Sequence, residues 1–91
     1  MKSTYEFVLE IGRQLQADLP DIKAVLVQDD LSRENATRFY ETLNRQLDTV
    51  TELLERLEEE DASDDQFAMA NSLADLLDDL SCGFLHRANN G

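Results

Sequence analysis

Cysteine is nearly absent from this sequence, which has Cys82 and no other. A lone cysteine excludes an intramolecular disulfide and is typical of a reducing compartment such as the cytoplasm. A thiolate metal site needs companion ligands, and the chain offers only one histidine, His86, four residues away. We therefore expect Cys82 to be a packing or surface residue in an intracellular protein.

Long apolar runs are missing as well. No segment approaches the roughly 18 consecutive apolar residues that a membrane-spanning helix needs. The N-terminus runs directly into an amphipathic pattern, with acids at Glu6 and Glu10, so it lacks the uninterrupted apolar stretch of a secretory signal. The sequence thus predicts a soluble protein without a membrane partner.

Catalytic and metal-binding motifs are also lacking. The chain has no glycine-rich loop for phosphates, no nucleophile elbow and no serine or cysteine paired with a histidine. A calcium-binding loop places its oxygen ligands around a central glycine, and the acidic segment 60–66 contains no glycine. We expect no enzymatic activity, no cofactor and no specific metal site.

Basic residues are scarce: 8 Lys and Arg stand against 20 Asp and Glu, which gives a formal charge of −12. A field of this sign opposes direct binding to nucleic acid or to an anionic membrane and favours basic protein partners. The charge is uneven, since residues 1–28 carry −1, residues 29–60 carry −6 and residues 61–91 carry −5. The simpler alternative is that the charge only keeps the protein in solution.

The strongest pattern present is a heptad repeat in a chain whose 91 residues suffice for a single domain, residues 1–91. After the candidate N-cap residue Ser32, apolar residues recur every four and three positions, as in a coiled coil. This pattern predicts a helix over residues 33–59. The seam consists of Ala36, Tyr40, Leu43, Leu47, Val50, Leu54 and Leu57.

A second long helix is predicted over residues 64–86. Ser63 and Gln66 form a capping box at its start, and the short connection after residue 59 forces an antiparallel hairpin. Its apolar residues cover more than one stripe, so it should pack against two neighbours. Gly83 and the C-terminal residues 89–91 predict fraying and an exposed tail.

The N-terminal third supplies the second neighbour. Ser3 begins a capping box before a helix predicted over residues 4–18, in which Gly12 would permit a close helix crossing. Pro20 should interrupt the helix. The segment 20–28 is rich in β-branched residues, but no partner strand exists, so a short helix fits better than a strand. The expected fold is all-α, a small bundle built on the long hairpin with one or two N-terminal helices packed on it.

Acidic residues gather on this hairpin. Some form a line about 27 Å long on the outer face of the 33–59 helix, which Arg45 interrupts and Arg56 should partly neutralise. Others crowd at the hairpin tip or lie on the last helix. The candidates for binding a basic partner are Glu41, Asp48, Glu52, Glu55, Glu58, Glu59, Glu60, Asp61, Asp64, Asp65, Asp75, Asp78 and Asp79. The pattern indicates partial imitation of a nucleic-acid backbone, or a surface for a groove rich in Arg and Lys.

Apolar residues on the last helix offer a second kind of candidate site, because they exceed what one antiparallel partner covers. Either the N-terminal helices bury them, or they form a dimer seam or a groove for a partner helix. These residues are Phe67, Met69, Leu76 and Leu85.

Two functional hypotheses follow from these surfaces. The first is an inhibitory or regulatory protein whose acidic hairpin docks on the basic, nucleic-acid-binding surface of a target protein. The second is a homodimeric helical adaptor, anti-activator or secretion-type chaperone that binds through apolar helix surface. In overall profile the chain is similar to the small acidic inhibitors that phages use against restriction and CRISPR systems. This resemblance lies in composition and not in a motif, and it implies the first hypothesis.

Overall fold

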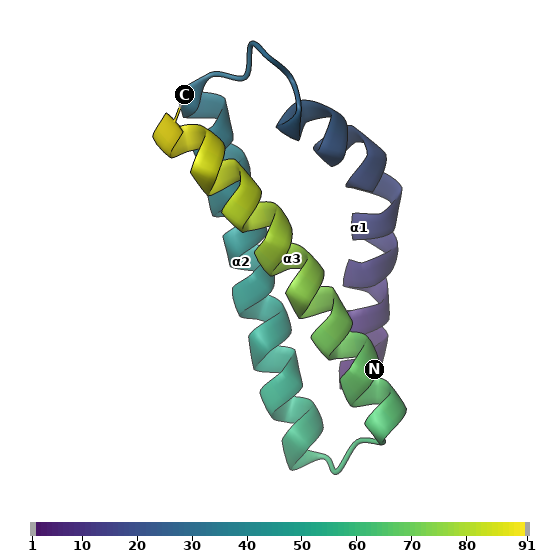
Figure 1. Cartoon of the computed structure of the whole chain (residues 1–91). Helices are drawn as coiled ribbons and strands as arrows, with labels where there is room; N and C mark the ends of the chain where they lie inside the picture. Colours follow the sequence, from purple (N-terminus) through teal and green to yellow (C-terminus); the bar gives the residue numbers. More distant parts are fainter. Residues whose placement is uncertain (1, 91) are drawn as a thin grey trace.

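The computed structural model describes residues 2–90, which form α1 (Thr4–Leu26), α2 (Arg33–Glu59) and α3 (Asp64–Asn90). Helices α2 and α3 form an antiparallel hairpin, and α1 lies along one side of it (Figure 1). No strand occurs between residues 2 and 90, and the molecule measures 45 × 21 × 21 Å. The predicted all-α fold, a long hairpin with an N-terminal helix, is confirmed.

Each helix begins after a serine whose side chain accepts a hydrogen bond from the backbone N–H three residues later. Because the first N–H groups of a helix have no partner within it, such caps determine where the helix starts. The predicted caps are confirmed. The pairs are Ser3 with Glu6 at 3.2 Å, Ser32 with Asn35 at 3.1 Å and Ser63 with Gln66 at 3.3 Å.

Helix α1 is one continuous helix, so the prediction of two helices separated at Pro20 is wrong. Helix was nevertheless the correct choice over strand for most of the segment 20–28, because α1 continues through it to Leu26. Pro20 cannot donate a backbone hydrogen bond to Gln16, but its ring is exposed and the turns on either side stay bonded. Figure 1 shows α1 curving in this half, as expected at an internal proline.

The hairpin tip, residues 60–63, is closed by backbone hydrogen bonds. The N–H of Ala62 donates to the carbonyl oxygen of Leu57 at 3.0 Å, and that of Asp61 donates to Glu58 at 3.3 Å. This pair of bonds is a Schellman motif, which needs a left-handed residue, and Asp61 has a φ of 53°. The last carbonyls of α2 are thereby satisfied while the chain reverses direction.

The predicted seam of α2 divides into two stripes of different burial. Ala36, Leu43, Val50 and Leu57 are at most 3% exposed and face α3. Tyr40, Leu47 and Leu54 are only half-buried. On α2, the residues that line a groove beside α1 are Phe39, Thr42, Leu43 and Gln46. The half-buried stripe therefore lies at the margin of the hairpin on the side away from α1.

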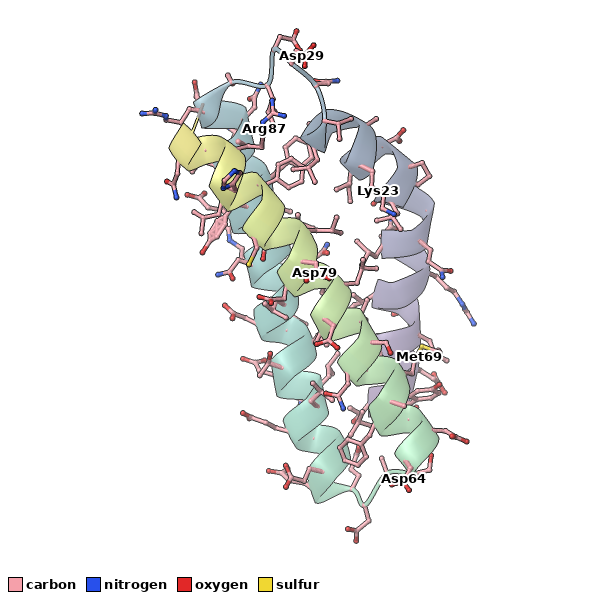
Figure 2. The ribbon with its side chains drawn as sticks, viewed as in Figure 1. Lys23, Asp29, Asp64, Met69, Asp79 and Arg87 are labelled. Carbon is pink, nitrogen blue, oxygen red and sulfur yellow. The ribbon has the colours of Figure 1, made fainter. Side chains whose placement is uncertain are left out.

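Helix α1 is fastened to the hairpin at both ends. Near its start, the hydroxyl of the buried Thr4 donates a hydrogen bond to Oε1 of Glu60 at 2.9 Å. At its end, the guanidinium of Arg87 donates a hydrogen bond to the carbonyl oxygen of Leu26 at 2.9 Å. Figure 2 shows Arg87 between the end of α3 and the loop that follows α1.

Glycine positions explain two further differences from the sequence predictions. Gly83 does not begin a frayed tail, because Leu26 packs over it and α3 continues to Asn90, beyond the predicted end at residue 86. The predicted tail residue Gly91 lies outside the described residues. The close crossing expected at Gly12 is also wrong, since a Cβ atom there would meet nothing within 4 Å. The close approach occurs at Gly83 instead.

Candidate functional site

An acidic row runs along α2 on the edge opposite its buried stripe. We define the acidic row as Glu41, Asp48, Glu52, Glu55 and Glu59. All of these side chains are exposed. At about 100° per residue they fall within an arc of about 60°. The arc points away from α3, because the buried stripe of α2 faces α3. Figure 2 shows carboxylate oxygens projecting from this outer edge.

The acidic row forms no ion pair with arginines of its own helix in the described part of the chain. This is true of Arg45, which interrupts the row, and of Arg56, which helical spacing suggested as a partly neutralising partner. An ion pair within α2 joins Nη2 of Arg38 to Oε1 of Glu34 at 2.8 Å. Glu34 falls within the same arc, and its seven-residue spacing from Glu41 is the signal that could have added it to the candidates.

Carboxylates of the acidic row stand at helical spacings where like charges repel one another. Like charges at i,i+3 and i,i+4 cost about 0.2–0.5 kcal/mol per pair when exposed. Asp48 with Glu52, and Glu55 with Glu59, are such pairs. Acids near the C-terminal end also oppose the helix dipole. None of the carboxylates of the acidic row forms an ion pair within residues 2–90 that would offset this repulsion.

The acids at the hairpin tip differ from the row, because most of them have structural roles. Glu60 accepts the hydrogen bond from Thr4, and Asp61 is the left-handed residue of the turn. Asp64 and Asp65 lie in the first turn of α3, where the helix dipole favours negative charge. Glu58 is exposed, and its side chain has no such role. The tip acids are thus largely explained by the fold.

The acids of α3 lie on the opposite edge of the hairpin from the acidic row. Asp75, Asp78 and Asp79 are exposed, while the stripe of α3 that contains Leu77 and Phe84 is buried against α2. Oδ1 of Asp78 accepts a weak hydrogen bond from Sγ of Cys82 at 3.9 Å. The candidate acids therefore form two edges and a tip, and not one continuous surface.

The apolar candidates are likewise divided between two sides of α3. Met69 and Leu76 line a groove next to α1, and Met69 is 48% exposed (Figure 2). Phe67 and Leu85 lie about 160–180° round the helix from them. Phe67 is half-buried and Leu85 is 40% exposed. These four residues cannot form one apolar interface.

Two grooves flank the middle of α1, where it stands away from the hairpin. The groove beside α2 has a volume of about 280 Å³ and includes Asp18 and Asp21 in its lining. The groove beside α3 has a volume of about 240 Å³ and includes Arg13. Within residues 2–90, no three acidic, histidine or cysteine side chains are grouped so that they could hold a metal ion. None of the helices described there is long and apolar enough to cross a membrane.

No protein-family model, characterised protein or solved structure matches this chain at a significant level. The features of the chain that bear on its function are therefore its two acidic edges, its tip and its apolar surfaces.

Proposed function

We propose that this protein is a non-enzymatic inhibitory or regulatory module whose acidic hairpin docks on a basic, nucleic-acid-binding surface of a target protein. Docking there would compete with DNA or RNA for the target. The observation that supports the proposal is the acidic row of α2, which is exposed, has no ion-pair partner within residues 2–90 and holds like charges at helical spacing. A row of this kind is explained by binding better than by folding.

The spacing of the acidic row limits the kind of mimicry involved. Glu41 and Glu59 are about 27 Å apart along the helix axis at 1.5 Å per residue, so the row has one carboxylate per about 7 Å. A DNA duplex has one phosphate per about 1.7 Å of axis. The row is therefore too sparse to imitate a duplex in full, and it suits a series of individual Lys and Arg side chains.

Charge reversal with a matched control tests the proposal. The test variant is Glu52→Lys, Glu55→Lys, Glu59→Lys, and the control is Asp21→Lys, Asp29→Lys, Asp30→Lys, at exposed sites outside the candidate set. Each reversal adds two charges, so both variants have a formal charge of −6 in place of −12. Each protein is used to capture partners from lysate of its source or host, with washes at low salt and at about 1 M salt.

The proposal expects a nucleic-acid-binding protein to be retained at low salt by the wild type and by the control, and lost with the test variant. Circular dichroism checks that both variants keep their helices. Equal retention by the test variant would contradict the proposal, because the acidic row would then contribute nothing to binding.

A second candidate function is favoured by the groove beside α3. Met69 is 48% exposed and lines this groove together with Leu76, which suits the homodimeric adaptor, anti-activator or secretion-type chaperone hypothesis. For that function we expect the partner to stay bound at high salt and to be lost with the Met69→Gln variant. The two candidates thus differ both in salt dependence and in the residue that matters.

A further inference from the structure

Two heptad stripes run side by side along α2. Tyr40, Leu47 and Leu54 form a half-buried apolar stripe. The residue after each of them is an acid of the acidic row, namely Glu41, Asp48 and Glu55. Successive residues are about 100° apart round a helix, so the acidic stripe flanks the apolar one along its whole length. In coiled coils, charges that flank an apolar heptad stripe select the partner helix.

Helix α3 completes an apolar surface beside this stripe. Phe67, Ala74 and Leu85 lie on the edge of α3 that is turned away from the α1 groove, and we call them, together with Tyr40, Leu47 and Leu54, the open face. Figure 1 shows α1 on one side of the hairpin only, and the open face is on the other side.

The stacked rings of Phe39 and Phe84 fix how the two halves of the open face are aligned. Their centroids are 4.8 Å apart with an interplanar angle of 11°. The helices are antiparallel and rise 1.5 Å per residue, so Tyr40 and Leu85 lie within about 3 Å of one level of the hairpin. By the same count Leu47 and Ala74, and Leu54 and Phe67, also lie within about 3 Å of one level, so the open face has three layers with the smallest side chain in the middle.

We propose that the open face binds one amphipathic helix of the target, with an apolar stripe on the seam between α2 and α3 and Lys or Arg on both of its flanks. This inference rests on the proposed function and names the element that the acidic hairpin recognises. Charge complementarity selects this occupant. The acidic row borders the open face on α2, Asp75 borders it on α3, and Asp78 lies on the face itself, between Ala74 and Leu85.

A second copy of the chain does not fit this surface, because it would bring another net −12 against the same acidic edges. The apolar stripe from Tyr40 to Leu54 spans about 21 Å, which corresponds to about four turns of the bound helix. Ala74 leaves room in the middle layer for a large apolar side chain of that helix.

Peptide binding tests the inference without knowledge of the target. The probe is a fluorescein-labelled synthetic helix of about 18 residues, with leucine at heptad seam positions and lysine and arginine at the flanks. A matched peptide has the same leucines and glutamate at the flanks. Binding is measured by fluorescence anisotropy with the wild type, with Leu85→Gln and with Met69→Gln. These two side chains have similar exposure, 40% and 48%, and lie on opposite sides of α3.

We expect the basic peptide to bind Leu85→Gln about tenfold more weakly than it binds the wild type. Its affinity for Met69→Gln should equal that for the wild type. The glutamate peptide should not bind. In ¹⁵N-labelled protein, amide shifts should be concentrated at Leu47, Leu54 and Ala74.

Three results would overturn the inference. The first is equal affinity of Leu85→Gln, with shifts only along the acidic row, which would leave the proposed electrostatic docking intact. The second is equal binding of both peptides, or of neither. The third is a wild-type dimer in light scattering that Leu85→Gln dissociates. The proposed function would be contradicted by a different result, namely that the Glu52→Lys, Glu55→Lys, Glu59→Lys variant still binds the natural target.

Discussion

The guanidinium of Arg87 on α3 donates a hydrogen bond at 2.9 Å to the carbonyl oxygen of Leu26, the last residue of α1 and 61 positions away in sequence. It also donates one to the carbonyl oxygen of Gln28. The last carbonyls of a helix have no partner within it, and the helix dipole makes that end negative. One side chain thus provides both the hydrogen bonds and the positive charge that the end of α1 needs.

Replacing Arg87 by methionine should therefore loosen the end of α1. We expect Arg87→Met to lower the free energy of unfolding by about 1–2 kcal/mol, since a hydrogen bond from a charged group is lost. Urea unfolding measures the change, and amide exchange should be faster in the last turns of α1. The control is Arg38→Met, whose exposed ion pair with Glu34 should cost less than about 0.5 kcal/mol. Equal effects of the two variants would contradict the role of Arg87.

The two helical glycines should respond in different ways to alanine. Gly12→Ala should raise the free energy of unfolding by about 0.5–1 kcal/mol, because alanine favours the helix and nothing lies within 4 Å of the new Cβ atom. In Gly83→Ala the new Cβ would be 3.1 Å from Cδ2 of Leu26, so that side chain must move. The gain should then be lost or reversed. Thermal unfolding measures the change in melting temperature for each variant. Identical changes would refute the contact between Leu26 and Gly83.

Asp61 occupies a backbone conformation that suits glycine. With its φ of 53°, we expect Asp61→Gly to raise the free energy of unfolding by up to about 1 kcal/mol. Asp61→Ala is the control, because it removes the same charge and keeps the Cβ atom. A higher free energy of unfolding in both variants would mean that Asp61 destabilises the tip through charge repulsion and not through its backbone conformation. Chemical unfolding at matched salt separates the two causes.

Neutralising part of the acidic row should stabilise the protein. Glu52→Gln, Glu55→Gln, Glu59→Gln removes like-charge pairs and an acid from the last turn of α2, so we expect a gain of about 1 kcal/mol at low salt. The gain should shrink at high salt, because exposed charges are screened. Asp21→Asn, Asp29→Asn, Asp30→Asn provides the charge-matched control. A loss of stability in the first variant would show that the row supports the fold.

Most of the architecture could be predicted from local signals. The heptad seam and the serine caps determine the start of each long helix, and the bounds of α2 agree with the prediction, residues 33–59. The short turn forced the hairpin. These signals are reliable because the cap residues and the apolar repeat act within a few positions of the chain.

The features of the fold that could not be predicted from the sequence depend on contacts between distant segments. Pro20 lies on the exposed side of α1, where a helix tolerates it, and only the fold reveals that side. Arg87 and Ala88 extend α3 because they meet α1 and the core. The sequence separates the acidic candidates into a line, a tip and a patch on the last helix, but only the antiparallel packing of α2 and α3 shows that the line and the patch lie on opposite edges.

A competition titration measures whether the acidic row displaces nucleic acid from the basic surface of the target. The captured target is saturated with a fluorescent DNA or RNA duplex, and wild type, the Glu52→Lys, Glu55→Lys, Glu59→Lys variant or the Asp21→Lys, Asp29→Lys, Asp30→Lys control is added. We predict release of the duplex by the wild type and by the control, and at least about tenfold weaker release by the row variant. Release by all three proteins alike, or by none, would show that the acidic row does not compete with nucleic acid.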